Sequence, residues 1–451
     1  MIPLTLGRIA EVTGGVTEDP GVLVTGPVVI DSREAAPGAL FVAIKGARVD
    51  GHDFAAGTVA AGAAGVLCTR PVGVPCVVVE DVQAALAALA SAVVRELPEV
   101  TIVGVTGSAG KTSTKDLLAQ LTERLGPAIA PAGSFNNEIG HPLTVLRADA
   151  DTRYLVLELS ARNVGHIAYL ARIAPPRVGV VLNVGTAHLG VFGGKEQIAR
   201  AKGELVEALP EDGAAVLNHD DDLVRAMASR TRARVTYFGR SPEADVRAED
   251  ETLDARGCAS FTLVTPGGRA PVTLRLHGSH AVLNALAAAA AAHELGMAAP
   301  DIAAVLSEAE PRSRWRMEVR ERPDGVTVIN DAYNANPDSV RAAFAALQGI
   351  AGDRRKYAVL AALQELGDEA DALNEEVAAH AAAQGLEALF IVGEGAEPML
   401  AGAPDAVHVP DVESAAAEIS GRLRPGDVVL VKGPRVAGLE RVAQSLLEVG
   451  Q

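Results

Sequence analysis

One segment of the sequence carries the residue types that bind the phosphates of a nucleotide. The apolar run 101–105 predicts a β-strand, and the glycine-rich stretch after it leads into a helix that opens with Lys111 and Thr112. Backbone N–H groups of such a loop, and the free N–H groups at the helix start, point at phosphates. Lys111 can reach the outer phosphates, and the Thr112 hydroxyl can bind magnesium. The sequence therefore predicts an ATP or GTP site formed by Gly107, Ser108, Ala109, Gly110, Lys111, Thr112 and Ser113.

The spacing of this loop departs from the strict P-loop pattern, because Val105 stands where that pattern has a glycine. The surrounding sequence still fits a strand, a turn and a helix. Gly126 can end the helix, and the apolar residues before it recur at helical spacing, at Leu117, Leu118, Leu121 and Leu125. An ordinary strand–turn–helix with chance glycines is the alternative, and Gly-Lys-Thr at a helix start argues against it.

Two polar residues follow apolar strands at the edge where parallel sheets form sites. Glu158 ends the strand predicted at 154–157, where a carboxylate next to the loop can be a second magnesium ligand. Its alternative role is to cap a helix. His188 lies in the glycine-flanked segment 183–190 after the strand predicted at 178–182, and it can contact a metal or a phosphate. A polar side chain satisfied within the protein is the equally weighted alternative.

Other candidates depend more on their surroundings. Lys202 lies on a predicted helix and taken alone would be a solvated lysine. The segment 331–339 follows a predicted strand and is rich in polar groups, of which Asp338 or Ser339 can cap the next helix while others contact a ligand. Arg316 lies at a domain junction, where it can clamp a phosphate as domains close or form a surface ion pair.

Length and composition restrict the class of protein. A chain of 451 residues with 49% hydrophobic residues predicts two or three folded domains. Its net charge of −17 argues against a nucleic-acid partner. The cysteines, Cys68, Cys76 and Cys258, are too few and too far apart for a disulfide framework or a zinc site. No signal pattern opens the chain, and its most apolar helical run, 281–292, is shorter than the ~20 residues of a membrane span. We expect a cytoplasmic protein without membrane insertion.

Strand and helix patterns alternate along three blocks, which predicts an α/β protein with largely parallel sheets. The first block is a small α/β domain at residues 1–98, and the second, at 99–311, is a P-loop domain with a parallel sheet. The third, at 312–451, resembles a doubly wound, Rossmann-like domain. Residues 232–273 are rich in β-formers and turns and predict a small antiparallel excursion.

Four segments together resemble the Mur ligases, the ATP-dependent amide-forming enzymes of peptidoglycan precursor synthesis. They are 106–112, 183–188, 278–286 with Asn284, and Lys432-Gly433. The loop of that family also lacks the strict P-loop spacing. Within the family the chain is most similar to the members that join D-alanyl-D-alanine to UDP-N-acetylmuramoyl-tripeptide. The stretches that discriminate are 31–33, 41–46, 50–54, 134–140 and above all 331–337, and residues 314–318 look like actinobacterial members.

The resemblance implies roles for the candidate residues. The first domain would bind the UDP-sugar, with Ser32 and Arg33 near the uridine diphosphate, and Asn136 and Asn137 would face the muramoyl peptide. ATP and Mg²⁺ would bind in the central domain, with the metal held by Thr112, Glu158 and His188.

The remaining roles come from the same resemblance. Lys202 matches a lysine that is carbamylated in several Mur ligases. The resemblance implies that the catalytic residues are Lys111, Glu158, His188 and Lys202. ATP would also contact Asn284, Arg316 and Asp331, while Asn334 and Asn336 would lie near the nucleotide or the incoming dipeptide. We expect a monomer.

Two other functions stay open from the sequence. One is a different amide ligase on the same scaffold, such as a folylpolyglutamate synthase-like enzyme, against which segment 331–337 argues. The other is a nucleotide-binding regulator, which would hydrolyse ATP slowly and without need of an acceptor.

Overall fold

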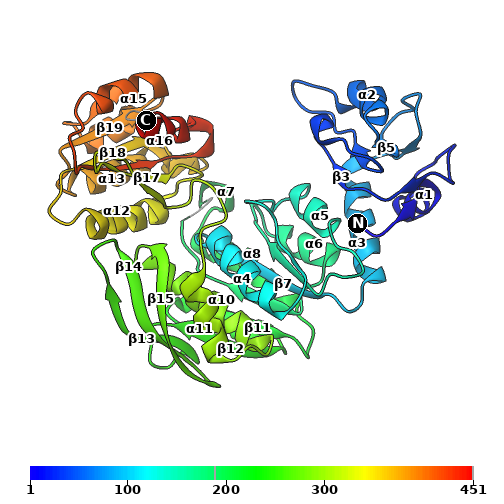
Figure 1. The fold of residues 1–451 in the computed structure, drawn as a ribbon, viewed down its shortest axis with the longest axis horizontal. Coiled ribbons are helices and arrows are strands. Elements are labelled where there is room, and N and C mark those ends of the chain that lie inside the picture. The colour runs from blue at the N-terminus through cyan, green and yellow to red at the C-terminus, as the bar shows by residue number, and fades with distance from the viewer. Residues whose placement is uncertain (187–188, 449–451) are drawn as a thin grey trace.

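The chain builds three α/β units in succession, each around its own sheet (Figure 1). The computed structural model describes residues 1–186 and 189–448. Within these residues the units have sheets of four, nine and six strands, and a two-stranded pair accompanies the first. We refer to them as the N-terminal unit (β1–β6), the central unit (β7–β15) and the C-terminal unit (β16–β21). Figure 1 shows the blue N-terminal unit and the orange to red C-terminal unit on opposite sides of the central one.

The N-terminal unit has a parallel sheet and shares its core with the central unit. The sheet order is β3 (Val28–Val29), β4 (Leu40–Val42), β5 (Gly65–Cys68) and β6 (Cys76–Val78), and β1 (Leu4–Thr5) pairs antiparallel with β2 (Leu23–Val24). The helices are α1 (Leu6–Thr13), η1 (Ser32–Glu34), η2 (Gly51–Phe54), α2 (Ala55–Ala60) and α3 (Val82–Glu96). One apolar cluster runs from this unit through the buried face of α3 into the central unit, so α3 joins the two.

The central sheet has the order β15-β14-β13-β12-β11-β10-β7-β9-β8 and is parallel from β8 to β13. Its strands are β7 (Thr101–Thr106), β8 (Ala128–Ile129), β9 (Tyr154–Glu158), β10 (Val178–Val181), β11 (Ala214–Asn218), β12 (Arg234–Gly239), β13 (Val246–Leu253), β14 (Cys258–Thr265) and β15 (Gly268–His277). Strand β7 is buried on both faces, as its continuous apolar run predicts. Neighbouring strands β9 and β10 end beside it, which gathers their following loops at one edge.

Helices cover both faces of the central sheet. One face carries α4 (Lys111–Leu125), α10 (His280–Glu294) and α11 (Ala299–Glu308). The other carries α5 (Gly140–Val145), α6 (His166–Ile173) and α8 (Lys195–Glu207), and the remaining short helices of this unit are α7 (Leu189–Phe192), α9 (Asp222–Arg225) and η3 (Ala226–Arg230). The alanine-rich α10 is buried along nearly its whole length, so it is a core helix.

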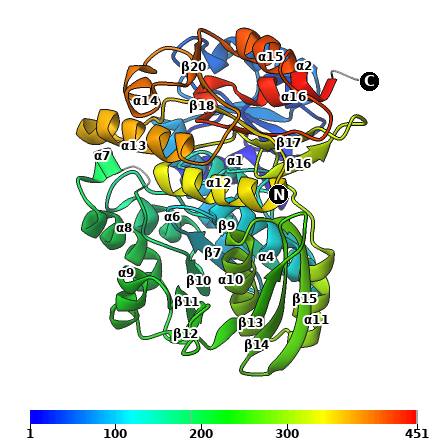
Figure 2. The same ribbon diagram turned by 90° about the vertical axis from the view of Figure 1, so that its left-hand side faces the viewer.

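The C-terminal unit is doubly wound. Its sheet order is β16 (Glu318–Glu321), β17 (Thr327–Asp331), β21 (Val428–Lys432), β18 (Lys356–Ala361), β19 (Ala388–Val392) and β20 (Val407–Val409), parallel except for β16. Helices α12 (Pro337–Ala351), α13 (Ala370–Ala382) and α14 (Glu397–Gly402) pack on one face, α15 (Val412–Ser420) and α16 (Glu440–Glu448) on the other, with η4 (Gly367–Glu369) and η5 (Arg435–Ala437) in loops. Figure 2 shows α12 lying where this unit meets the central one.

The predicted α/β class with three parallel-sheet units is confirmed. The antiparallel excursion predicted over 232–273 is confirmed for β13–β15, but β12 pairs parallel with β11, and β15 continues to His277. Edge strands β16 and β20 were not predicted, because short edge strands with polar or charged residues lack an apolar run. Helix α4 ends at Gly126 as predicted. Among the described residues, no helix combines the length and the apolar character that a membrane crossing needs.

One buried histidine makes the core sensitive to acid. His141 on α5 is fully buried, and within the described part of the chain neither of its ring nitrogens has a hydrogen-bond partner. Burial lowers the pKa of His141 from 6.5 to about 4, and the nearby backbone of Leu170 and of Glu158 offsets this shift only in part. The folded protein therefore holds the neutral ring, while the unfolded chain binds a proton below pH 6.5. Stability should fall as the pH drops from 6.5 towards 4.

We predict that His141→Leu removes this acid sensitivity. Between pH 7 and pH 5 the wild-type protein should lose about 2 kcal/mol of unfolding free energy through this group, and the variant should not. Leucine leaves no buried donor unpaired, so the variant should be at least as stable as wild type at pH 7. Urea midpoints at the two pH values measure both effects, with the exposed His408→Leu as control. An unchanged pH dependence in His141→Leu would contradict the account.

Candidate functional site

A cleft of about 560 Å³ lies between the central and C-terminal units. One wall is the glycine-rich loop and the loops after β8 and β9. The other wall consists of C-terminal segments, among them the loop after β17. The wall residues are 108–113, 134, 136–138, 158, 160–162 and 166 from the central unit, and 316, 333–336, 339, 364–366 and 434–436 from the C-terminal unit. The sequence-predicted loop and segment 331–339 therefore meet at one place.

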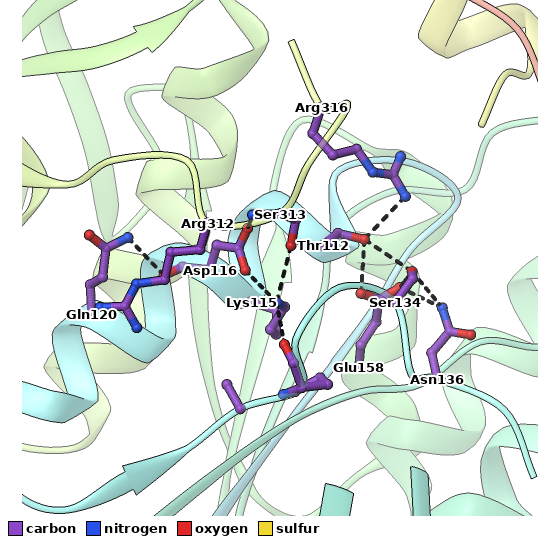
Figure 3. A network of polar contacts seen from close by, with 12 residues as sticks. Thr112, Lys115, Asp116, Gln120, Ser134, Asn136, Glu158, Arg312, Ser313 and Arg316 are labelled. Carbon is purple, nitrogen blue, oxygen red and sulfur yellow. Dashed lines mark hydrogen bonds and ion pairs between the residues drawn. The ribbon is translucent and has the colours of Figure 1, made fainter. Parts of the chain in front are cut away.

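Four hydroxyl, amide and carboxylate side chains converge at the base of this cleft (Figure 3). Glu158, at the end of β9, is fully buried, and its Oε2 accepts a hydrogen bond of 2.9 Å from Thr112 Oγ1. Its Oε1 accepts from Ser134 Oγ at 2.9 Å and from Asn136 Nδ2 at 2.6 Å. A buried carboxylate needs such partners, because leaving its charge unpaired is costly. The prediction that Glu158 lies beside Thr112 is confirmed.

The glycine-rich loop is held from behind by a residue that follows the neighbouring strand β10. Asn183 follows β10, and its Oδ1 accepts hydrogen bonds from the N–H groups of Ser108 (3.0 Å) and Ala109 (2.9 Å). These two N–H groups therefore bind the protein instead of pointing into the cleft, which differs from the prediction for a phosphate loop. Lys111 Nζ donates to the Gly107 carbonyl at 2.8 Å.

Two lysines near the loop experience a low-dielectric environment. Burial lowers the pKa of Lys111, the charge of Glu158 raises it, and the charge of Arg316 lowers it. Lys202 on α8 is 6% exposed, and burial together with the charge of Lys111 lowers its pKa well below the usual range. Lys202 is therefore buried, so the alternative expectation of a solvated lysine is wrong. His188 lies outside the described residues.

Arg316 reaches from the C-terminal unit to the loop. Its Nη2 donates to Thr112 Oγ1 at 3.3 Å, and its guanidinium stacks over the Tyr333 ring at 4.2 Å. The flanking residues Trp315 and Met317 have φ angles of 59° and 48°, a region that non-glycine residues rarely adopt. Within the described residues, the buried Nε of Arg316 has no hydrogen-bond partner. Strained backbone and an unpaired donor both occur at sites that bind a ligand.

Asp331 lies behind Arg316 and off the cleft wall. It is 8% exposed, and its Oδ2 accepts from Lys432 Nζ at 2.6 Å while its Oδ1 accepts from the Met317 N–H at 3.1 Å. Its carboxylate therefore braces the strained turn. Asn284 on α10 is likewise buried off the cleft wall, where its Oδ1 accepts from Thr114 Oγ1 at 3.4 Å. Neither of these two predicted ATP contacts lines the cleft.

The predicted substrate residues have different surroundings. Asn334 lines the cleft, whereas Asn336 both lines it and caps α12 through its Oδ1, which accepts from the Ser339 N–H at 2.8 Å. The prediction that Asp338 or Ser339 caps this helix is wrong, since Asn336 is the cap and Ser339 completes the capping box. Asn137 lies in the turn before α5, where its Oδ1 accepts from the Gly140 N–H at 2.8 Å.

Ser32 and Arg33 lie on η1 in the N-terminal unit and do not line this cleft. The Arg33 guanidinium pairs with Asp31 at 2.6 Å. A second, smaller cleft of about 290 Å³ opens at the carboxyl ends of β4 and β5 beside α3, and neither residue lines it. It is lined by residues 43–45, 52, 69, 80–83 and 139.

Sequence reasoning missed three residues that shape the site, namely Ser134, Asn183 and Asp338. Ser134 and Asn183 lie in segments that the sequence singled out, but their roles depend on partners across the sheet. Asp338 was read as a cap. The available signal for Asn183 was its position directly after a strand that neighbours β7. A polar residue there can bond the loop that follows β7, as Asn183 does.

The donor set fits a magnesium ion. Mg²⁺ prefers hard oxygen ligands and keeps several waters, so one carboxylate and one hydroxyl beside bound phosphates are enough. Glu158 and Thr112 offer these two oxygens 2.9 Å apart, whereas no group of three or more His, Cys, Asp or Glu ligands occurs among residues 1–186 and 189–448. Thr112 and Glu158 would therefore hold the ion together with oxygens of a bound nucleotide and water.

Comparison with known proteins agrees with this geometry. The model described as "Mur ligase family, catalytic domain" matches residues 27–122, "Mur ligase middle domain" matches 105–292, and "Mur ligase, glutamate ligase domain" matches 315–435. A UDP-N-acetylmuramoyl-tripeptide--D-alanyl-D-alanine ligase from Mycobacterium tuberculosis (strain ATCC 25618 / H37Rv) is 48% identical, over 99% of this chain and 98% of that one. The chain belongs to the Mur ligase family.

Two solved MurF structures share the whole fold. Crystal structure I of MurF from Acinetobacter baumannii aligns with a TM-score of 0.89 and 31% identity, over 99% of both chains. MurF from Thermotoga maritima, solved in complex with ADP, aligns with a TM-score of 0.82 and 31% identity, over 94% of this chain and 98% of that one. The similarity therefore extends over all three units of this Mur ligase.

The two walls of this Mur ligase cleft touch directly behind the loop. Asp338, in the first turn of α12, accepts hydrogen bonds from the N–H and the hydroxyl of Thr186, at 2.8 and 2.9 Å. The preceding Gly185 N–H donates to Ser108 Oγ at 2.9 Å, and a Cβ at Gly185 would lie 2.3 Å from Asp338 Oδ2. A Cβ at Gly190 would lie 2.1 Å from the Gly367 nitrogen. Glycine at 185 and 190 thus permits the C-terminal unit to dock this closely.

We predict that Asp338→Ala lowers the acceptor-dependent rate of phosphate release about tenfold without lowering the melting temperature. Hydrogen bonds to a charged group contribute about 1.5 kcal/mol or more, and here they join two units instead of filling a core. Steady-state kinetics and thermal unfolding measure the two quantities. Asp371→Ala is the matched control, because it removes an acidic residue from the first turn of the neighbouring α13. Equal rates for both variants would contradict a role of Asp338 in closure.

Proposed function

We propose that this chain is an ATP-dependent ligase that joins D-alanyl-D-alanine to UDP-N-acetylmuramoyl-tripeptide, giving UDP-N-acetylmuramoyl-pentapeptide, ADP and phosphate. The observation that carries the proposal is the two-walled cleft, in which Thr112 of the phosphate loop meets Arg316 of the C-terminal unit. A relative named for this reaction is 48% identical over nearly the whole of both chains. The enzyme would supply the last peptide extension of a peptidoglycan precursor.

The nucleotide would bind with its phosphates over residues 107–113. Lys111 would neutralise charge on the outer phosphates, and the unpaired Nε of Arg316 would donate to a phosphate oxygen. Thr112 and Glu158 would hold Mg²⁺, with His188 as a further proposed ligand. When bound, the ion would offset the negative charge that develops on the transferring phosphoryl group. Asn284 and Asp331 would act from behind the loop and the turn, in keeping with their burial.

Amide formation needs activation of the tripeptide carboxylate, because oxide is a poor leaving group. A carboxylate oxygen attacks the γ-phosphorus of ATP, the bond to the ADP oxygen breaks, and an acyl phosphate forms. The neutral amine of D-alanyl-D-alanine then attacks the acyl carbon, a C–N bond forms, phosphate leaves, and the amine releases a proton. Lys111 and Arg316 would stabilise the charge in both steps, and closure through Asp338 would keep water from the acyl phosphate.

The substrates would occupy different parts of the molecule. The UDP moiety would bind the N-terminal unit, near Ser32 and Arg33, and the peptide would run past Asn136 and Asn137 into the cleft. Asn334 and Asn336 would lie beside the dipeptide or the nucleotide, in keeping with their position on the cleft wall.

We propose that Lys202 is carbamylated. A neutral amine adds to carbon dioxide, forming an N–C bond with loss of one proton, and the low pKa of Lys202 makes the neutral form available. The product is an anionic carbamate, which would place a negative charge near Lys111 and provide another oxygen ligand for the metal.

The remaining expectations are proposals of the same kind. Domain boundaries would fall near residues 98 and 311, in the loops between α3 and β7 and between α11 and β16. We expect a monomer that acts in the cytoplasm, where ATP is available.

Phosphate release from ATP tests the proposed function. It should require UDP-N-acetylmuramoyl-tripeptide and D-alanyl-D-alanine together, and mass spectrometry should show the UDP-muramoyl-pentapeptide. Release that ignores both substrates would overturn the proposal and favour a nucleotide-hydrolysing regulator.

Lys111→Ala should lower this rate at least about a hundredfold, because removing one group that stabilises transition-state charge costs about 10²–10³ in rate. Binding of the UDP-tripeptide, measured calorimetrically, should change less than about twofold, since a separate unit holds the uridine diphosphate. Lys195→Ala is the matched control, because Lys195 is exposed and, like Lys111, begins a helix. If Lys111→Ala lost both phosphate release and UDP-tripeptide binding while Lys195→Ala kept both, the separation of the two sites would be contradicted.

A further inference from the structure

A buried lysine that the proposed mechanism does not use lies one turn along α4 from Thr112. Lys115 is 1% exposed. Its ammonium donates to the Asp116 carboxylate, to the Pro131 carbonyl at 2.8 Å and to Ser313 Oγ at 3.4 Å. Three N–H donors thus meet three acceptors from three parts of the chain, of which Figure 3 labels Asp116 and Ser313.

Two of these acceptors lie just before residues that enter the proposed metal site. Pro131 precedes Ser134, which donates to Glu158 at 2.9 Å. Ser313 precedes Arg316, which donates to Thr112 at 3.3 Å. Lys115 lies three residues after Thr112 on α4, so both side chains leave the same face of the helix.

The segment before Arg316 is fixed along the same helix. Asp116 Oδ2 accepts from the Ser313 N–H at 2.9 Å. One turn further, Gln120 exchanges two hydrogen bonds with the backbone of Glu310, at 3.0 and 3.2 Å. Residues 310–313 therefore move with α4, and the strained turn at Trp315 and Met317 begins only after the last contact, at Ser313.

We propose that Lys115 is a positioning residue for the metal and nucleotide site, acting through Ser134 and Arg316. Its ammonium bonds both the Pro131 carbonyl and the Ser313 hydroxyl. It thereby fixes the starting positions of the segments 131–134 and 313–316, which end beside Thr112 and Glu158. This inference rests on the proposed function, because the site that it orders is the ATP and magnesium site. A buried ion pair contributes little net stability, so the effect expected of Lys115 lies in the two segments that it holds.

The test removes the charges of Lys115 and Asp116 in one double variant. Lys115→Met with Asp116→Asn keeps the length of both side chains and leaves no buried charge without a partner. Isothermal titration calorimetry measures ADP affinity with and without Mg²⁺, which reports on the site without turnover. The control is Arg322→Met, because the Arg322 side chain is only 8% exposed and bonds one carboxylate and one carbonyl, Asp324 and Leu446, within the C-terminal unit.

The proposal predicts that the gain in ADP affinity caused by Mg²⁺ falls about 10- to 100-fold in the double variant, as for residues that orient metal ligands. Arg322→Met should change only the melting temperature. Ser134→Ala should reduce the magnesium-dependent gain in ADP affinity less in the double variant than in the wild type. The reason is that Lys115 is proposed to act through Ser134, so the two effects are not additive. An unchanged magnesium effect, or additive losses, would overturn the proposal. If wild-type phosphate release ignores both substrates, the proposed function fails instead, and the calorimetric result still decides the role of Lys115.

Discussion

The site depends on one hydrogen bond across two neighbouring parallel strands, between Thr112 and Glu158. Strands β7 and β9 pair in register, so the residues that follow them emerge at the same edge of the sheet. The carboxylate is buried there, and two hydroxyls and an amide donate hydrogen bonds to it. Every other group of the cleft is placed relative to this pair: Asn183 holds the loop from behind, and Arg316 approaches the same hydroxyl from the C-terminal unit.

Closure is the second constraint, and it follows from the first. A cleft that receives a residue from another unit needs contacts that fix the distance between the units. Asp338 meets the segment after β10, and glycines at 185 and 190 remove the side chains that would hold the two surfaces apart. The segment after β10 thus contacts both the phosphate loop and the C-terminal unit. A mechanism that must protect an acyl phosphate from water requires such a connection.

Much of this could be predicted from the sequence because the signals are local. The glycine-rich loop, the strand before it and Glu158 at a strand end all follow from short patterns, and the structure places them together. Contacts between distant residues could not be read in this way. Asp331 has the sequence context of a ligand residue, yet its partner is Lys432, 101 residues away, and the pair lies behind the cleft. Asn336 and Asp338 are both competent helix caps by type, and only the approach of Thr186 decides that Asp338 joins two units.

Calorimetric titration of Glu158→Gln with ADP, in the presence and absence of Mg²⁺, tests the central claim most directly. Glutamine keeps the size of the side chain and one carbonyl acceptor but loses the charge. The account predicts that Mg²⁺ no longer strengthens ADP binding, while magnesium-free binding changes less than about twofold because the loop itself is intact. A magnesium effect equal to that of the wild-type protein would contradict the assignment of Glu158, and with it the arrangement on which the cleft is built.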